Sequence, residues 1–450
     1  MKLGLIAMSG VRAHNPELTA LGLTLPGFVE RNKVIASLPS LGLLTLAGLT
    51  PAGVDVHYLE VPDLKDISGV PGEFDVVAIS SFSAQIYEAY ELADRYRLLG
   101  TRVILGGLHV SALPDEARSH ADAVVIGEGE PVWPAILSDL QPSGGGLKPT
   151  YDARELNYTF ANSPMPRFDL LDIERYNRLT VQTQRGCPFR CEFCAASIRI
   201  SPTYKIKPVD RVIAKIHAIK ALWKRPFIEF ADDNTFVNKA HSKQLLRALA
   251  GEGVRWFTET DLSVADDEDL LDMLREAGCA EVLIGFEGTT FSSVDGVEQR
   301  ANWKAKRVDS YLEAIRKIQD RGVRVNGCFI LGLDGAGTES FDRIWEFVQL
   351  TGLYDVQITV QTAFPSTPLY TRLKNECRIL RDQAWELCTL FDVNFRPAKM
   401  TAAELEAGLR TLGSRIYSDE STQKRREDFR RNYIAKHRHN TTQSRGKHVH

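Results

Sequence analysis

The chain of 450 residues contains 44% hydrophobic and 25% charged residues, and its formal net charge is −3. This composition is typical of a soluble globular protein with several domains, and the net charge excludes an electrostatic basis for nucleic-acid binding. No apolar stretch reaches the length of a transmembrane segment, there is no secretory signal, and the cysteine usage fits a reducing compartment, so we expect a cytoplasmic protein.

Short apolar runs alternate with longer amphipathic stretches over residues 1–141, which is the rhythm of a βαβ fold. Because the apolar runs are continuous, they favour parallel strands that are buried on both faces. The sequence therefore predicts an α/β domain with a doubly wound, Rossmann-like sheet. Its predicted strands are Leu3–Ala7, Val54–Val61, Phe74–Ser80, Val103–Gly106 and Ala123–Ile126.

Small residues follow these strands, at the edge where doubly wound sheets bind their ligands. Small side chains let the backbone approach a bulky ligand closely, but tight turns between a strand and a helix explain the same residues equally well. The segments concerned are Ser9-Gly10, Ser80 to Ser83, Gly106 to His109 and Gly127 to Glu130.

Residues 142–172 are predicted to connect this domain to a second one. A run of three glycines between Pro142 and Leu147 is typical of a flexible connection. Order is expected to return before the next strand, Thr180–Gln184.

Three cysteines come directly after that strand. Cys187, Cys191 and Cys194 form a Cys-x3-Cys-x2-Cys run. Thiolates are the ligands of iron–sulfur clusters, and three of them on one tight loop can hold three corners of a [4Fe-4S] cluster while the fourth iron stays open. A structural zinc site would instead need a closed tetrahedral set, and therefore a distant fourth ligand.

The alternation of strands and helices resumes after the cysteines. Together with the strand at Thr180–Gln184, five further strands predict a partial (β/α) barrel over residues 173–395. Chemistry in such barrels takes place at the C-terminal ends of the strands, which is where the cysteine loop lies. The further strands are Phe227–Phe230, Arg255–Thr260, Glu281–Phe286, Arg324–Leu331 and Asp355–Ala363.

Residues 396–450 are predicted to form a helical region followed by a basic tail. Ala402–Ile416 is amphipathic, and residues 423–431 are strongly basic. Residues 436–450 contain so little apolar material that we expect them to be disordered.

The cysteine run, with the aromatic Phe193 before its last cysteine, resembles that of the radical SAM enzymes. The resemblance implies that Cys187, Cys191 and Cys194 hold a [4Fe-4S] cluster whose open iron binds S-adenosyl-L-methionine. That family cleaves the sulfonium reductively to a 5′-deoxyadenosyl radical, with electrons from a donor such as a flavodoxin or ferredoxin. The resemblance assigns contacts with S-adenosylmethionine to Phe193, Glu287, Ile330 and Gly332.

The N-terminal domain is similar to the cobalamin-binding domain fused to many radical SAM enzymes. Its first loop contains only His14 and lacks the Asp-x-His-x-x-Gly pattern of the methionine-synthase type, so we expect no histidine on the lower face of cobalt. We interpret His109 as a hydrogen-bonding turn residue rather than a cobalt ligand. The resemblance assigns cobalamin contacts to Ser80, Ser83, Gly106, Gly107, His109, Gly127, Glu128 and Gly129.

Within this family, residues 231–234 and 365–370 resemble the group of hopanoid methylases and anaerobic magnesium-protoporphyrin cyclases. This implies cobalamin-dependent methyl transfer to an unactivated carbon of a lipid, tetrapyrrole or specialised metabolite. The alternative is a radical SAM cyclase, lyase or rearrangement enzyme whose N-terminal domain does not use cobalamin. A cobalamin or redox sensor is disfavoured, because the C-terminal residues are too few and too polar for an output module such as a DNA-reading helix pair.

Overall fold

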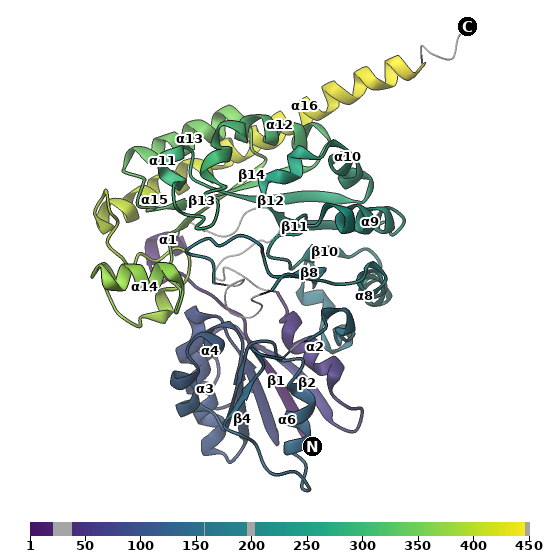
Figure 1. The fold of residues 1–450 in the computed structure, drawn as a ribbon, viewed down its shortest axis with the longest axis vertical. Coiled ribbons are helices and arrows are strands. Elements are labelled where there is room, and N and C mark those ends of the chain that lie inside the picture. The colour runs from purple at the N-terminus through teal and green to yellow at the C-terminus, as the bar shows by residue number, and fades with distance from the viewer. Residues whose placement is uncertain (21–37, 157, 196–202, 446–450) are drawn as a thin grey trace. The chain divides into compact units, whose positions relative to one another are not determined.

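A computed structural model of the chain describes residues 1–20, 38–156, 158–195 and 203–445 (Figure 1). The backbone packs into two compact units. Among the described residues, the first unit contains residues 1–233 and 362–395, and the second contains residues 234–361 and 396–445. Each unit is built on parallel strands with helices between them, so the predicted α/β class is confirmed.

The first unit begins with a six-stranded parallel sheet in the order β2-β1-β3-β4-β5-β6. Helices α3 and α4 cover one face of this sheet, and α2 and α6 cover the other (Figure 1). The strands are β1 (Lys2–Met8), β2 (Asp55–Val61), β3 (Val76–Ser80), β4 (Arg102–Gly106), β5 (Ala123–Ile126) and β6 (Thr150–Asp152). The helices are α1 (Pro16–Ala20), α2 (Leu41–Leu49), α3 (Ile86–Leu98), α4 (Leu108–Ala112), α5 (Pro114–Ala117) and α6 (Trp133–Asp139).

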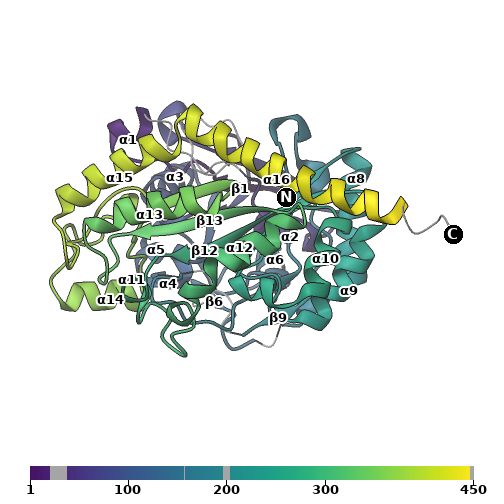
Figure 2. The same ribbon diagram turned by 90° about the horizontal axis from the view of Figure 1, so that it is seen from above.

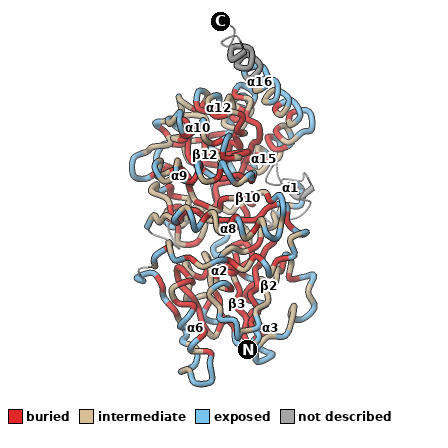
Figure 3. Tube along the Cα trace, turned by 90° about the vertical axis from the view of Figure 1, so that its right-hand side faces the viewer, coloured by how far each residue is buried: buried red, intermediate tan, exposed pale blue. Residues whose placement is uncertain are grey.

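Strand β1 shows why this sheet needs a helical layer on each face. Leu3 and Leu5 pack into the core beneath α2 and α6, whereas Ile6 and Met8 pack into the core beneath α3. Successive side chains of a strand point to opposite faces, so a continuous apolar run buries both of them. Strand β3 is likewise buried over most of its length, as its colour in Figure 3 shows. The predicted doubly wound domain is confirmed, and β6 is a strand that the sequence did not predict.

The strand order changes direction between β1 and β3. Strand β1 pairs with β2 on one side and with β3 on the other, and β4 to β6 continue beyond β3. Loops that follow neighbouring strands at such a switch point diverge and leave a crevice at the carboxyl edge of the sheet. Ser9 and the segment Ser80 to Ser83 therefore lie at the edge where this fold binds ligands.

The rest of the first unit contains the first strands of the second predicted domain. Strands β7 and β10 are parallel neighbours, and α8 packs against β7. Residues 362–395 belong to the same unit, because Trp385 and Cys388 join the apolar core beside α3. The elements are β7 (Leu179–Val181), β8 (Gln184–Arg185), β9 (Lys205–Ile206), α8 (Val209–Leu222), β10 (Phe227–Phe230) and α14 (Pro368–Asn375).

The second unit contains four parallel strands in the order β14-β13-β12-β11. With β7 and β10, all six strands that the sequence predicts for the second domain are present. The strands are β11 (Arg255–Thr260), β12 (Cys279–Glu287), β13 (Arg324–Leu331) and β14 (Asp355–Val360). The helices are α9 (Lys239–Ala250), α10 (Glu268–Glu276), α11 (Phe291–Val294), α12 (Tyr311–Asp320), α13 (Glu339–Thr351), α15 (Ala402–Ile416) and α16 (Asp419–Arg445).

Helix α16 corrects one expectation from the sequence. It packs against α12 and α15 and continues to Arg445, so the prediction of disorder from Lys436 is wrong up to that residue (Figure 2). The helix is anchored by side chains earlier along it and at Lys436, which pairs with Asp320 of α12. Composition alone does not reveal such an anchor. No helix in the described part of the chain is both long and apolar enough to cross a bilayer.

A buried polar cluster lies among the strands of the second unit. Glu281 of β12 accepts a hydrogen bond from Asn326 of β13 at 3.3 Å, and Asp355 of β14 pairs with Arg426 of α16 at 3.3 Å. Arg324 lies 3.6 Å from Glu281. Burial, with Asp355 as a second negative group, raises the pKa of Glu281 to about 8.

This cluster predicts how stability depends on pH. Glu281 binds its proton more tightly in the folded state than in the unfolded chain. The stabilisation that comes from the protonated side chain is therefore complete below about pH 4.5 and is lost as the pH rises toward 8. The substitution Glu281→Gln should therefore raise the free energy of unfolding at pH 8 by about 1–3 kcal/mol and flatten its pH dependence. Thermal melts followed by circular dichroism between pH 5 and pH 8.5 test this.

The matched control is Glu346→Gln, which removes an exposed carboxylate on α13 of the same unit. Its pH profile should follow that of the unmodified protein. If both variants and the unmodified protein lose stability in parallel as the pH rises, Glu281 is not the group responsible.

Candidate active site

A cavity of about 520 Å³ lies within the first unit. One wall is formed by the loops that follow β1, β3, β4 and β5, at the carboxyl edge of the N-terminal sheet. The opposite wall is formed by residues of the second predicted domain, among them Thr180 and Gln182 at β7 and Glu229 and Ala231 at β10. The cavity thus places the switch-point edge of one sheet opposite the first two strands of the other.

Glycines bring the backbone of the sheet up to this cavity. Gly107 has a φ of +104°, and a Cβ atom there would lie 2.9 Å from the Ser80 hydroxyl oxygen. Gly127 also has a positive φ, of +82°. Both positions therefore need glycine for conformation, and the missing side chains leave room for a bulky ligand. Of the residues assigned to cobalamin, the cavity is lined by Ser80, Gly106, Gly107, Gly127, Glu128 and Gly129.

Ser83 and His109 were assigned to the same ligand, but they face each other outside this cavity lining. The imidazole of His109 is fully buried, with Nδ1 3.0 Å from the Ser83 hydroxyl and Nε2 3.1 Å from Glu116. Burial alone would raise the pKa of Glu116, but hydrogen bonds from His109, Trp385 and Tyr90 hold it below its usual value. The contacts of His109 are those of a hydrogen-bonding residue within the turn.

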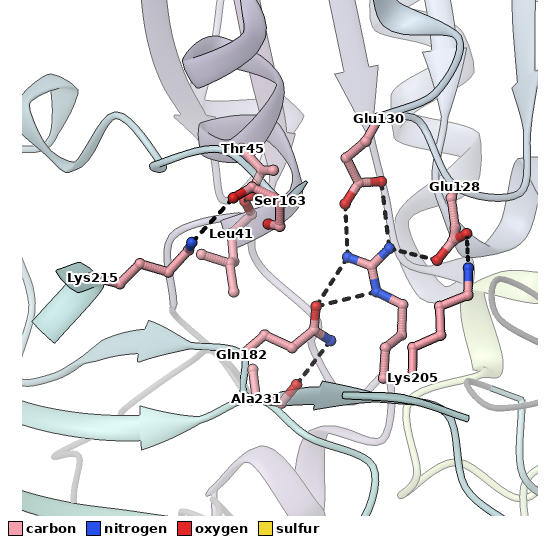
Figure 4. Close-up of polar contacts among 10 residues, drawn as sticks. Leu41, Thr45, Glu128, Glu130, Ser163, Gln182, Lys205, Lys215 and Ala231 are labelled. Carbon is pink, nitrogen blue, oxygen red and sulfur yellow. Dashed lines mark hydrogen bonds and ion pairs between the residues drawn. The ribbon is translucent and has the colours of Figure 1, made fainter. Parts of the chain in front are cut away.

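Arg185 of β8 connects the two walls of the cavity, and its partners Glu128, Glu130 and Gln182 are labelled in Figure 4. Its guanidinium donates to Glu128 at 2.9 Å, to Glu130 at 2.8 Å and to the Gln182 side chain at 3.0 Å. Lys205 also pairs with Glu128. Burial opposes the charge of Arg185, yet the two glutamates raise its pKa above the usual value. The Gly-Glu-Gly-Glu loop of the N-terminal sheet is thereby fixed to the strand that leads into the cysteine run.

Two aspartates after β10 hold the backbone of the same strand end. Asp232 accepts hydrogen bonds from the backbone N–H groups of Thr183 and Gln184, at 2.7 and 3.1 Å. Asp233 accepts one from the Gly186 N–H at 2.8 Å. The structure therefore supports a loop-fixing role for these carboxylates.

The three predicted cluster cysteines lie on the loop after β8. Cys191 is buried, Cys187 and Cys194 are half-buried, and the Cys194 N–H donates to the Cys191 carbonyl at 3.1 Å. Among the described residues, no three His, Cys, Asp or Glu side chains close around a single metal ion. Three thiols on one loop, with Gly186 fixed immediately before them, fit the three-point ligand set of a [4Fe-4S] cluster.

Helix α14 holds this loop from the other side. Arg372 forms a two-point ion pair with Glu192, which lies between the second and third cysteines, at 2.8 and 3.1 Å. The Leu369 N–H also donates to the Glu192 carbonyl at 3.1 Å. A forked guanidinium pair fixes orientation as well as distance, so α14 restrains the loop at its centre.

The second unit contains three of the residues assigned to S-adenosylmethionine, and Phe193 lies in the first unit with the cysteines. Glu287 and Ile330 line the same narrow cavity, and Gly332 follows β13 with a φ of +85°. Glu287 is buried, pairs with Lys304 at 2.8 Å and has a φ of +62°. A positive φ is strained for a glutamate, and such strain tends to occur at functional sites.

Sequence reasoning did not identify Arg185, Lys207 or Lys215, which all line the first cavity. A signal was present for Lys215. It lies on the apolar stripe of α8, among Val212, Ile216 and Ile219, where an amphipathic helix normally carries a hydrophobic residue.

Comparison with protein families gives three matches. Residues 31–137 match the B12 binding domain, and residues 181–349 match the radical SAM superfamily. Residues 367–449 match a domain of unknown function, DUF4070, and this range includes all of α14.

Curated relatives match most of the chain. Bacteriochlorophyllide d C-12(1)-methyltransferase of Chlorobaculum tepidum is 26% identical over 407 residues, which cover 88% of this chain and 86% of the relative. The uncharacterized methyltransferase sll1242 of Synechocystis is 28% identical, with 80% and 68% covered. The hopanoid C-2 methylase of Rhodopseudomonas palustris is 24% identical, with 78% and 67% covered.

A similar solved structure is the radical S-adenosylmethionine methyltransferase TsrM from Kitasatospora setae, with cobalamin and a [4Fe-4S] cluster bound. The TM-score is 0.65 at 16% identity, and the match covers 96% of this chain and 99% of that one. At this identity, the likeness establishes a shared fold.

The ion pair between Arg372 and Glu192 predicts a measurable effect on the cysteine loop. The substitution Arg372→Gln should loosen the loop, because one partner of a largely buried two-point pair is lost. We expect the iron content after anaerobic reconstitution, and the visible absorption of the cluster, to fall by about half. Circular dichroism should show an unchanged fold.

Arg378→Gln is the matched control, because it also removes an arginine that pairs with a glutamate, at 2.8 Å from the exposed Glu376. It should keep full iron content. Arg372→Lys should recover only part of the loss, since an ammonium cannot form the forked pair. Full cluster content in Arg372→Gln would show that the pair does not position the loop.

Proposed function

We propose that this radical SAM protein, whose N-terminal sheet is a B12-binding domain, is a cobalamin-dependent methyltransferase acting on an unactivated carbon of a small-molecule or lipid substrate. The observation that carries the proposal is the cavity of the first unit. There the switch-point edge of the B12-binding domain faces the strands that lead into the cysteine loop, and Arg185 fixes one to the other. The names of the similar proteins, which are methyltransferases and a methylase, support methyl transfer.

The two cofactors would supply complementary chemistry: a [4Fe-4S] cluster would supply the electron for reductive cleavage of S-adenosylmethionine, and cobalamin would supply a transferable methyl group. Cys187, Cys191 and Cys194 would hold the cluster, while Asp233 and the pair Arg372–Glu192 keep their loop in place. Electrons would come from a donor such as a flavodoxin or ferredoxin.

The chain's own residues also shape the surroundings of both cofactors. Phe193, Glu287, Ile330 and Gly332 are proposed to contact S-adenosylmethionine. The small residues at the sheet edge let cobalamin approach the backbone, as Gly107 and Gly127 illustrate. Closure of the cavity by both walls would exclude water from a reactive radical.

Product analysis tests the proposal. The reconstituted enzyme is incubated with a metabolite extract of the organism from which the protein comes. The mixture also contains a reductant and S-adenosylmethionine with a deuterated methyl group. A methyltransferase of this kind should release S-adenosylhomocysteine and 5′-deoxyadenosine in comparable amounts, and mass spectrometry should find a product that carries the labelled methyl group.

Cys194→Ala should abolish formation of 5′-deoxyadenosine, whereas Cys377→Ala, which changes an exposed cysteine, should not. 5′-Deoxyadenosine formed with no labelled product would refute methyl transfer and support the cyclase or lyase alternative.

The histidine contacts predict the coordination of cobalt. Both ring nitrogens of His109 are engaged by Ser83 and Glu116, and the loop after β1 lacks the Asp-x-His-x-x-Gly pattern. The electron paramagnetic resonance spectrum of bound cob(II)alamin should therefore be the same in protein made with ordinary histidine and with ¹⁵N-histidine. A change in nitrogen superhyperfine splitting on labelling would reveal a histidine ligand.

A further inference from the structure

The glutamates that line the cavity of the first unit are already paired with cations. Glu128 and Glu130 share Arg185, at 2.9 and 2.8 Å. Glu229 pairs with Arg178. The guanidinium of Arg185 is fully used by these two glutamates and Gln182. The charges of these three glutamates are therefore compensated without any help from the remaining lysines.

Two lysines on the same wall have no such partner. Lys207 and Lys215 both line the cavity, and each is only 2% exposed. Within the described part of the chain, neither forms an ion pair. The Lys215 ammonium has a long hydrogen bond of 3.5 Å to the Ser163 carbonyl (Figure 4), and the Lys207 ammonium lies 4.5 Å from the centre of the Phe160 ring.

A buried ammonium without a counter-ion is costly, and the cost favours loss of its proton. Burial, and then the positive charge of Lys215, lowers the pKa of Lys207 to about 7. Burial, and then the charge of Arg211, lowers the pKa of Lys215 to about 8. A methionine or leucine in either place would avoid this cost, so fold stability does not explain the two lysines. Their presence indicates that this part of the cavity binds a negatively charged ligand.

The wall of the cavity on which the two lysines lie indicates which ligand they contact. Lys215 lies on α8, and Lys207 follows β9 directly, so both belong to the radical SAM region and not to the B12-binding sheet. They form part of the wall opposite the glycine-rich edge of that sheet. In the proposed function, the methyl acceptor lies between these two walls.

We propose that Lys207 and Lys215 bind an anionic group of the methyl acceptor, a carboxylate or a phosphate. This inference rests on the proposed function, because it takes the cavity to be the substrate site. Two ammonium groups can hold one such anion, and the anion restores the charge that burial disfavours. Anchoring the acceptor at one end fixes the position of its reacting carbon relative to both cofactors.

The test measures anion binding without turnover, on full-length protein reconstituted with its cluster and cobalamin. Butyrate and inorganic phosphate are the probes, added separately at equal ionic strength. At least one of them should raise the melting temperature by about 1–3 °C, since a ligand that binds only the folded state stabilises it. The double variant with Lys207→Met and Lys215→Met should show no shift.

Lys224→Met is the matched control, because it removes an exposed lysine just beyond α8. It should respond to the anions like the unmodified protein. If the double variant does not fold, the pKa values of the lysines are measured by NMR in unmodified protein carrying ¹³C-methylated lysines. The effective anion should then raise two depressed pKa values toward the ordinary lysine range, and their insensitivity to both anions would refute the proposal.

Two further measurements separate the possible sources of the anion. Cobalamin content, from its visible absorption, and affinity for S-adenosylmethionine, from equilibrium dialysis, should change less than twofold in the double variant. Loss of cobalamin would assign the lysines to the phosphodiester of that cofactor, and a tenfold weaker affinity for S-adenosylmethionine would assign them to its carboxylate. Either result overturns the substrate assignment. If the unmodified protein binds the anion through these lysines but forms no methylated product in the product analysis, the proposed function is refuted instead.

Discussion

The buried contact of Arg185 with Glu128 and Glu130 is the interaction on which the candidate site depends. A buried ion pair is stabilising only when its geometry is complete, because each charge has lost its water. Here the guanidinium meets two carboxylates and the Gln182 side chain, so its donors are well occupied. Arg185 is two residues before Cys187, and the contact therefore couples the position of the cysteine loop to the edge of the B12-binding sheet.

The cysteine loop is supported from two other elements as well. Asp233, after β10, fixes the Gly186 backbone before the first cysteine, and Arg372 of α14 fixes Glu192 between the second and third. A loop held in this way is organised before its cluster binds, which reduces the entropy lost on binding. The region matched by the domain of unknown function therefore contributes directly, through α14, to the proposed cluster site.

Lys207 and Lys215 on the cavity wall differ from the residues that support the loop, because the supporting residues have partners within the chain. Arg185, Asp233 and Arg372 find their partners within the chain, so structural roles explain them fully. Lys207 and Lys215 are as buried as core residues, but neither forms an ion pair among the described residues. Polar groups that fold stability does not explain are the best indication of what a cavity binds.

Local patterns in the sequence were sufficient to predict the strands, because a buried parallel strand requires a continuous apolar run, as in β1 and β13. The cysteine spacing likewise predicts a cluster-binding loop, since the proposed ligands lie within eight consecutive positions. Tertiary structure alone decided which charges meet. Arg185 and Glu128 are 57 residues apart, and no local pattern pairs them. The same holds for β6, a short strand stabilised by its neighbour β5, and for α16, a polar helix anchored through Lys436. Lys215 resembled any other residue of an amphipathic helix until the fold placed it in a cavity, because its burial and its lack of an ion pair with any described residue are properties of the folded chain and not of its sequence.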